Sequence, residues 1–493
     1  MPRQPLLSLS VGAAISLGFA GLIAFLAPQF AWDIVLRDRP IAFFTIVLVS
    51  SCLVFTVWFF WAKSGFATGH AGWKSRHLLL LVFAVGVAGR LILLPGPPIL
   101  EDDHYRYLWD GAVSAEGLNP YAHPPARFAT APDVERLSQA LGVRPDPPPP
   151  GYAKLADNGR ETLLRVNNPH IATIYPPPVQ AVFALAYRLA PFSLTALKLV
   201  FLGAEILGFL FLWLALRGLG QGPFALSLYW WNPLVLKEFA NSAHMDALLI
   251  PALALILWLI VGRKERLAAA AVGMAAAIKF WPAMLVAALF RRSQRFWLLA
   301  LIGGAIALTL TAPQLLALDR EAGLVRYGAD WQRNALVFPL LQSALIWAGD
   351  AAATLARLLV IAVLACMAFL FWNGAGDGQS GRPGPWRVPI PKDPVMRAAL
   401  LVLLLCLLSP TGYPWYAVWL LPFAVLRPTW LLIALPAFAG FYYSDFLVQA
   451  GVIDQRWAMI PALLSAAPAL VLLILHFVSP HIVEEPVHDM AHP

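Results

Sequence analysis

Three consecutive carboxylates, Glu101, Asp102 and Asp103, follow an apolar segment that ends at Leu94. They stand where an apolar helix should leave the bilayer, and burial in hydrocarbon would cost several kcal/mol for each charge. The acids should therefore face water or a polar cavity. A carboxylate placed beside a hydroxyl group can remove its proton as a general base, so these residues are catalytic candidates. The alternative is a solvated helix end that only marks the interface.

The residues after the acids predict a short helix that begins at His104. Asp103, Tyr107 and Asp110 then fall on one face, at i, i+4 and i+7. The more apolar face carries Tyr105, Leu108, Trp109 and Ala112. Such a helix suits the headgroup region, with its aromatic side chains toward lipid. We expect it to hold Asp103 just outside the membrane.

These motifs resemble a known family. An acidic residue, a spacer and an aspartate at the end of a transmembrane helix, followed by Glu-Gly-x-x-Pro-Tyr at 116–121, are similar to the first large loop of the GT-C glycosyltransferases. The likeness is to polyprenyl-phosphate-mannose-dependent mannosyltransferases, bacterial ones related to the GPI-type enzymes. It extends to DDHYRYLWDG (102–111), NPHIATIYPP (168–177) and WNPLVLKEFANSAHMDAL (231–248). One departure is that GT-C enzymes commonly place the acidic loop after their first transmembrane helix, whereas here two apolar segments precede the helix that carries the acids.

The resemblance implies a GT-C-like bundle with a large, non-cytoplasmic first catalytic loop. It also implies a sugar, expected to be mannose, moving from a polyprenyl-phosphate-sugar donor to a hydroxyl of a glycan or glycolipid acceptor. The reaction would invert the anomeric carbon at the periplasmic face of a bacterial inner membrane. Asp103 matches the second acid of the family pattern and is the expected base, with Asp102 and Glu101 in reserve.

Polar residues near the ends of other apolar segments are candidates for binding the substrate. Lys237, Asn241 and His244 share one helical face by spacing. Lys237, His244, Lys279 and Arg333 could stabilise a leaving phosphate as charged donors. The full set of substrate-binding candidates is Arg106, Tyr107, Tyr175, Lys237, Asn241, His244, Asp246, Lys279, Arg333 and Tyr413. The simpler interpretation is that such groups only line the membrane interface.

Composition sets the class of protein. The chain has 493 residues, of which 60% are hydrophobic and 13% charged, a balance typical of an all-α polytopic membrane protein in a lipid bilayer. Apolar segments predict roughly 11–13 transmembrane helices. The net charge of +8 is attributed to cytoplasmic loops, and no nucleic-acid partner is expected.

No cofactor is expected from the motifs. The sequence has no zinc signature and no glycine-rich nucleotide loop. The three cysteines, Cys52, Cys366 and Cys406, lie inside apolar runs and suggest neither a metal site nor a disulfide. A divalent metal ion held by the acids is left open, although the pattern does not favour it.

Basic residues set the expected orientation. Lys63, Lys74 and Arg76 mark a cytoplasmic loop before the third apolar segment, so the acids should emerge on the opposite side. Both ends of 267–290 then appear cytoplasmic, which predicts a kinked or re-entrant segment that brings Lys279 to a polar cavity. A similar conflict of parity affects 176–192.

Five regions follow from these patterns. Two N-terminal transmembrane helices occupy 1–77, and a GT-C-like catalytic module that includes loop 96–175 occupies 78–372. A cytoplasmic linker at 373–396, C-terminal transmembrane helices at 397–479 and a disordered tail at 480–493 complete the chain.

Two other functions fit much of the same pattern. A flippase or transporter for a polyprenyl lipid would also place charges in a cavity, and so would a catalytically inactive relative. The transferase hypothesis makes the sharper geometric prediction, that Asp103, His244, Lys279 and Arg333 line one polar pocket at the outer face of the membrane.

Overall fold

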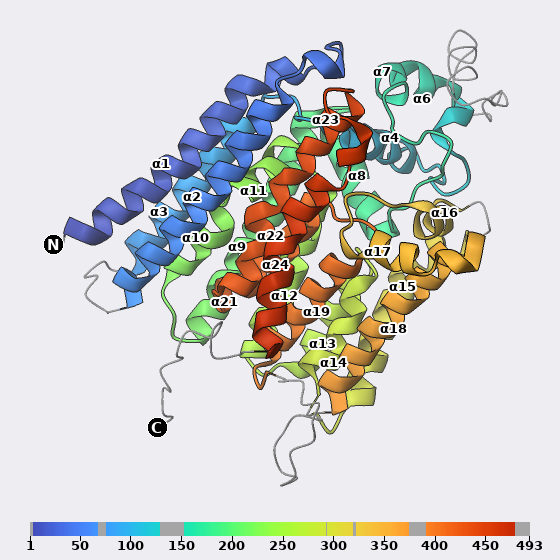
Figure 1. Cartoon of the computed structure of the whole chain (residues 1–493). Helices are drawn as coiled ribbons and strands as arrows, with labels where there is room; N and C mark the ends of the chain where they lie inside the picture. Colours follow the sequence, from blue (N-terminus) through green and yellow to red (C-terminus); the bar gives the residue numbers. More distant parts are fainter. Residues whose placement is uncertain are drawn as a thin grey trace.

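The molecule is a bundle of helices (Figure 1). The computed structural model describes residues 3–67, 75–128, 152–291, 293–318, 322–373 and 391–478. Every regular element in these ranges is a helix, and none is a β-strand. The predicted all-α polytopic membrane fold is confirmed. Most of the predicted linker at 373–396, and all of the tail at 480–493, lie outside the described residues.

Fewer helices are long enough to cross the membrane than the sequence predicts. Among the described residues, eight have the required length and hydropathy, and one broken pair would make nine. Two shorter apolar helices, Pro394–Leu408 and Pro414–Leu426, would bring the total to eleven if both crossed. The sequence overcounts because short helices buried inside the bundle are as apolar as those that span the bilayer.

The N-terminal part is a three-helix layer made of α1 (Arg3–Leu26), α2 (Ile41–Ala67) and α3 (Ser75–Leu93). The α1–α2 loop contains two single turns, η1 (Ala27–Phe30) and η2 (Leu36–Asp38). Helix α1 packs against both α2 and α3. The packing is close, since a Cβ on Gly12 of α1 would meet the Trp58 ring of α2 at 2.0 Å.

The end of α3 is fixed just before the acids. Lys198, on α9 (Leu194–Gly218), donates from Nζ to the carbonyl oxygens of Leu93 at 3.1 Å and Gly96 at 2.7 Å. The last carbonyl groups of a helix have no partner within the helix, so the ammonium group caps α3. A buried ion pair of 2.6 Å between Arg90 and Glu205 joins the same two helices.

A small subdomain covers one end of the bundle. It contains α4 (Asp103–Ala115), α6 (Ala153–Asn158), α7 (Arg160–Leu163) and α8 (Pro177–Leu189), which gather beside α16 and α23 in Figure 1. Helices α4 and α8 touch so closely that a Cβ on Gly111 would meet the carbonyl oxygen of Phe183 at 2.5 Å. With 13 residues, α8 is about 20 Å long and too short to cross alone, which accounts for the conflict of parity at 176–192.

The predicted helix after the acids is present, but its expected contact with lipid is wrong. The apolar face of α4 packs inside the subdomain, where Trp109 is 1% exposed and clusters with Phe128, Tyr152 and Leu163. The sequence could not distinguish a face that meets lipid from one that meets another helix, because both are apolar.

Two segments in the centre are broken rather than continuous. Pro233–Asn241 and Met245–Val261 meet at a bend of 105°. The first part contains α11 (Pro233–Val235) and a π-helical turn, η5 (Leu236–Asn241); the second contains η6 (Met245–Leu248) and α12 (Leu249–Val261). Backbone of this kind is tolerated at membrane depth only where protein or a water-filled cavity surrounds it.

The second broken segment agrees with the kinked or re-entrant form predicted for 267–290. Helix α13 (Glu265–Ala276) ends, the chain turns through η7 (Trp281–Met284), and the short α14 (Leu285–Leu289) follows. Helices α13 and α14 contact each other, as the two arms of a hairpin do. Lys279 lies at the turn between them.

The remaining helices complete the bundle. They are α9, α10 (Ser227–Trp230), α15 (Phe296–Leu316), α16 (Gly323–Asp330), α17 (Val337–Ala344), α18 (Ala352–Asn373), α19 (Pro394–Leu408), α20 (Pro414–Ala417), α21 (Leu421–Leu426), α22 (Trp430–Phe438), η10 (Ala439–Ser444), α23 (Asp445–Gln449) and α24 (Ile460–Val478). Four of them, α16, α20, η10 and α23, line one side of the candidate site. A single parallel bridge between Arg333 and Thr411 ties the segment after α16 to the segment after α19.

Candidate active site

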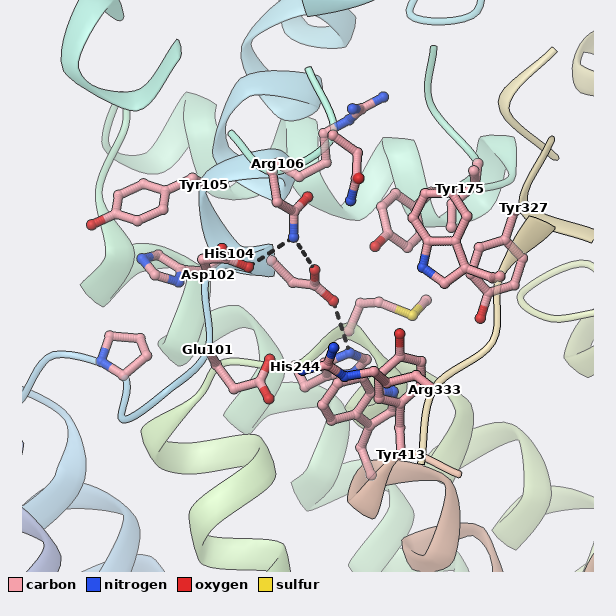
Figure 2. Close-up of a pocket in the computed structure, with 18 of the residues that line it drawn as sticks. Glu101, Asp102, His104, Tyr105, Arg106, Tyr175, His244, Tyr327, Arg333 and Tyr413 are labelled. Atoms are coloured by element: carbon pink, nitrogen blue, oxygen red, sulfur yellow. Dashed lines mark hydrogen bonds and ion pairs between the residues drawn. The ribbon is translucent and has the colours of Figure 1, made fainter. Parts of the chain in front are cut away.

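A cavity of about 860 Å³ opens beneath the subdomain. Its lining comes from the α1–α2 loop, the residues on both sides of the acids, 167–176, the breaks at 244–245 and 278–280, α16 and the segment that follows it, and 413–449. The volume lies within the range of about 300–1,000 Å³ that is usual for small-ligand sites. Figure 2 shows the acids between side chains that arrive from opposite directions.

One asparagine joins two of the three acids. Nδ2 of Asn167 donates to Oδ1 of Asp102 at 2.8 Å and to Oδ1 of Asp103 at 2.6 Å. Because an amide nitrogen carries two hydrogens, it can serve both carboxylates at once and hold them side by side. Burial first, and then the negative charge of Asp103, raise the pKa of Asp102 to about 6.

Asp103 has two further donors. Its Oδ2 accepts from the Tyr107 hydroxyl at 3.3 Å and lies 3.3 Å from Nε2 of His244. Burial acts to raise the pKa of Asp103, but the hydrogen bond and charge of His244, together with Asn167 and Tyr107, outweigh it, so the pKa falls below its ordinary value. Asp103 is therefore the acid that stays ionised most readily.

His244 is held between two carboxylates. Its Nε2 faces Asp103, and its Nδ1 lies 2.9 Å from Oδ2 of Asp246. Carboxylate oxygens at both ring nitrogens favour the imidazolium form, in which both nitrogens donate, and the backbone amide of Asp246 also lies 3.3 Å from Nδ1. Trp415 covers one face of the ring at a centroid distance of 4.1 Å and an angle of 22°, which fixes its plane.

Opposite charges continue from His244 to a lysine. Nζ of Lys279 donates to both oxygens of Asp246, at 2.7 and 2.9 Å, and Nε1 of Trp419 donates to Oδ1 at 2.7 Å. Charges therefore alternate along Asp103, His244, Asp246 and Lys279, and we call these four residues the charge chain. Asp246 is fully buried, whereas the Lys279 side chain is 25% exposed and lines the cavity.

Glu101 lines the cavity, but its partners form a different cluster behind the cavity wall. The Tyr443 hydroxyl lies 3.4 Å from Glu101 and donates more closely to Glu238, at 2.9 Å. Lys237 donates from Nζ to the Tyr443 oxygen and, at 2.7 Å, to Oγ of Ser242. Burial is the largest cause, and the charges of nearby acids add to it, so the pKa of Glu101 is well above its usual range even though Lys237 opposes the change.

Stacked rings and an arginine line the side of the cavity near α20. Tyr413 and Trp415 stack at 4.4 Å and 9°, and Tyr327 and Tyr416 join their hydroxyl groups at 2.8 Å. Arg333 forms an ion pair of 2.8 Å with Asp445. Flat rings next to cations suit a ligand that has both a sugar face and a phosphate.

The cavity unites most of the predicted site. The prediction that Asp103, His244, Lys279 and Arg333 line one pocket is confirmed. The candidates that line it are Glu101, Asp102, Asp103, Arg106, Tyr175, His244, Lys279, Arg333 and Tyr413. Tyr107 and Asp246 lie behind the wall and act through the side chains they contact.

Two candidates do not have the predicted geometry. Lys237 and Asn241 were expected to share a helical face with His244, but η5 is a π-helix and Ala243 has a φ of 54°, so the α-helical spacing does not apply. Lys237 is fully buried in the Glu238 cluster and cannot reach a phosphate in the cavity. The interpretation of Lys237 as a phosphate ligand is wrong.

Asn241 and Arg106 stabilise the backbone around the site. Asn241 accepts from the amide of Ile99 at 3.0 Å and donates to the carbonyl oxygen of Pro97 at 3.0 Å, so it fixes the segment just before the acids. Arg106 reaches the cavity wall, but its guanidinium is engaged by Asp110 at 3.1 Å and by the Ile171 carbonyl at 2.8 Å.

Several site residues escaped sequence reasoning. Asn167 immediately precedes the 168–177 motif, and that position was the available signal for it. Tyr443, which reaches the acids from η10, and Trp419, which binds Asp246, lie in apolar segments without any local signal. Trp415, from the segment after Tyr413, packs on the ring of His244.

No group of three or more His, Cys, Asp and Glu side chains within the described ranges has the arrangement of a metal site. Comparison of the chain with protein families, with curated proteins and with solved structures finds no match. The function must therefore be argued from the cavity itself.

Proposed function

We propose that this protein is a membrane glycosyltransferase that moves a sugar from a polyprenyl-phosphate donor to a hydroxyl group of a glycan or glycolipid. The observation that carries the proposal is the cavity, where Asp102 and Asp103 lie side by side among rings and cations at one end of an apolar bundle. A lipid-linked donor can keep its chain in the bilayer while its phosphate and sugar enter such a site. Mannose as the sugar, and a periplasmic site in a bacterial inner membrane, rest on the resemblance at 101–121, 168–177 and 231–248.

In the proposed reaction, Asp103 accepts the proton of the acceptor hydroxyl. The acceptor oxygen attacks the anomeric carbon as the bond from that carbon to the phosphate oxygen breaks. Polyprenyl phosphate leaves with the electron pair, and the anomeric configuration is inverted, as expected for a single displacement. Three donors orient the Asp103 carboxylate, and orientation of this kind is a large part of general-base catalysis.

The charge chain favours Asp103 over its neighbours as the base. In the resting state the two anions and two cations of the charge chain cancel. When Asp103 takes up a proton, the charge chain acquires a net positive charge, with Lys279 exposed in the cavity. The positive charge develops at the moment when the phosphate leaves, which stabilises the transition state more than the ground state. Asp102 has no comparable link to a cation among its hydrogen bonds in the described part of the chain.

The test is transfer itself. The purified protein in nanodiscs is incubated with a labelled polyprenyl-phosphate sugar and a membrane extract as the source of acceptors. We expect label in a new glycan or glycolipid, and no transfer by Asp103→Asn. Movement of the labelled lipid between leaflets without transfer would instead identify a flippase, and donor binding with neither activity would identify an inactive relative.

A further inference from the structure

The α1–α2 loop, residues 27–40, forms part of the cavity wall. It contributes Phe30, Ala31, Trp32 and Arg39 to the lining. The loop joins α1 and α2, the two apolar segments that precede the helix carrying the acids and depart from the GT-C pattern. In Figure 2, Tyr105 lies on one side of Asp102, and Tyr327 lies on the other. The centroids of the Trp32 and Tyr105 rings are 5.7 Å apart, so the loop lies on the Tyr105 side of the acids, opposite Tyr327.

Trp32 exposes half of its surface inside this wall. The residue is 51% exposed, and its ring meets Tyr105 edge to face, at an interplanar angle of 80°. The guanidinium of Arg165 lies 5.9 Å from the Trp32 ring and 5.6 Å from the Tyr105 ring. A tryptophan that only anchored the protein would point to the headgroups, whereas this ring offers a face to the cavity.

Arg39 differs from the other cations that line the cavity. Arg106, Lys279 and Arg333 are each ion-paired with a carboxylate, at 3.1, 2.7 and 2.8 Å. Arg39 instead donates to two uncharged acceptors in its own loop, the carbonyl oxygens of Ile34 at 2.9 Å and Ala31 at 3.2 Å. Hydrogen bonds to carbonyl groups hold the side chain in place without neutralising its charge, and Asp33 of the same loop acts on it only through its charge, with no direct ion pair in the described ranges. Within the described ranges it is therefore the lining side chain best placed to bind an added anion.

His104 packs against Tyr105 on the same side of the acids. It is 4% exposed, and the centroids of its ring and the Tyr105 ring are 4.0 Å apart. Burial first, and then nearby cations, lower the pKa of His104 to about 3, so the ring is neutral. Its Nδ1 is closed off from the cavity, so this residue positions Tyr105 and does not meet a ligand through that atom.

We infer that Trp32, Tyr105 and Arg39 form a second subsite that takes a sugar ring carrying an anionic group. The sugar ring packs on Trp32, and the anion binds Arg39. The charged headgroup of a glycolipid and a soluble sugar phosphate share this chemistry. If the proposed function holds, the subsite is that of the acceptor. It lies across the acids from Tyr327, Tyr413 and Arg333, the rings and cation that suit the sugar and phosphate of the donor.

Direct binding tests the subsite without any transfer reaction. The full-length protein in phosphatidylcholine nanodiscs is titrated with glucose 6-phosphate, glucose and inorganic phosphate in a calorimeter. We expect glucose 6-phosphate to bind more tightly than either part alone. Arg39→Gln should weaken its binding about tenfold or more, the loss of a hydrogen bond to a charged group, and should not change the binding of glucose.

Trp32→Ala should weaken the binding of both glucose and glucose 6-phosphate by about three- to tenfold, the loss of a ring contact. Arg37→Gln and Trp347→Ala are the matched controls, because Arg37 is an exposed arginine of the same loop outside the lining and Trp347 is a 77% exposed tryptophan outside it. Both controls should bind as the original protein does. Unchanged thermal unfolding temperatures show that all four variants are folded.

A second titration, in nanodiscs that contain phosphatidylinositol, identifies the source of the ligand. Loss of glucose 6-phosphate binding there, but not with phosphatidylglycerol, indicates a lipid headgroup, and retained binding indicates a soluble sugar phosphate. The inference is overturned if Trp32→Ala and Arg39→Gln bind glucose 6-phosphate as the original protein does, or if binding is lost in Arg333→Gln instead. It is also overturned if none of the probes binds. An inactive transferase would still give the expected binding, so the two proposals fail separately.

Discussion

Replacing Asp103 by asparagine separates the two adjacent acids as candidates for the base. The change keeps the size of the side chain but removes the negative charge and the proton acceptor. Loss of a general base typically lowers the rate by about 10²–10⁴-fold, and we expect a fall of kcat/KM of that size. Asp102→Asn removes a charge but keeps an oxygen that can accept from Asn167, so it should cost at most about tenfold. Donor binding should remain in both variants.

The pH dependence gives a second, independent measurement of the same point. Asp102, with a pKa of about 6, is ionised above pH 6 and becomes protonated as the pH falls. At pH 5 about one molecule in eleven would retain its charge, so a reaction that used Asp102 as base would slow about tenfold for each unit below pH 6. Asp103 has a lowered pKa and stays ionised throughout that range.

The assay is kcat/KM for transfer of a labelled sugar between pH 5 and pH 8. If Asp103 is the base, the original protein should lose less than about twofold through the ionisation of that base across this range, and Asp102→Asn should have a similar profile. A tenfold decline per unit below pH 6 that disappears in Asp102→Asn, with activity retained in Asp103→Asn, would refute the assignment and move the base by one residue.

Three further predictions concern structure and orientation. Asp246→Leu should lower the free energy of unfolding by about 3–5 kcal/mol, measured by thermal or chemical unfolding, because it leaves the buried His244 ring and the partly exposed Lys279 without their shared anion. Gly323→Ala should reduce transfer and thermal stability, since its Cβ would lie 2.0 Å from a carbonyl oxygen of the 167–176 segment; Gly328→Ala, on the same helix with open space, should be neutral. In a cysteine-free background, Asp157→Cys should react with an impermeant thiol reagent in intact cells, and Arg266→Cys only after permeabilisation; the reverse pattern would invert the orientation.

The sequence predicted the parts of the site that stand out against an apolar background. A charged residue at membrane depth is conspicuous because hydrocarbon cannot solvate it, and Asp103, His244, Lys279 and Arg333 were found in this way although 230 residues, from 103 to 333, separate the first from the last. The turn at Lys279 was predicted because basic, cytoplasmic loops flank both ends of the segment 267–290, which has the length of a single crossing.

Sequence reasoning failed where it depended on the local shape of the backbone. The Lys237, Asn241 and His244 face assumed 3.6 residues per turn, but the π-helical turn at Leu236–Asn241 and the break after it rotate each side chain differently. Apolar patterns were also ambiguous about partners, as Trp109 on α4 illustrates, because the interior of a protein and the interior of a bilayer select the same residue types.

The two buried clusters have a consequence for how the chain is made. Asp246 enters the membrane region before its cationic partner, since Lys279 follows it by 33 positions. Lys237 and Glu238 form an ion pair with each other, but the Tyr443 hydroxyl that both contact follows Lys237 by 206 positions. At about 5–20 residues per second of synthesis, the second interval lasts roughly 10–40 seconds. During that time the broken helix carries charges that hydrocarbon does not tolerate. Stable insertion of the centre of the bundle must therefore wait for its C-terminal helices, so a chain truncated before η10 should be a substrate for membrane quality control even though most of its crossings are complete.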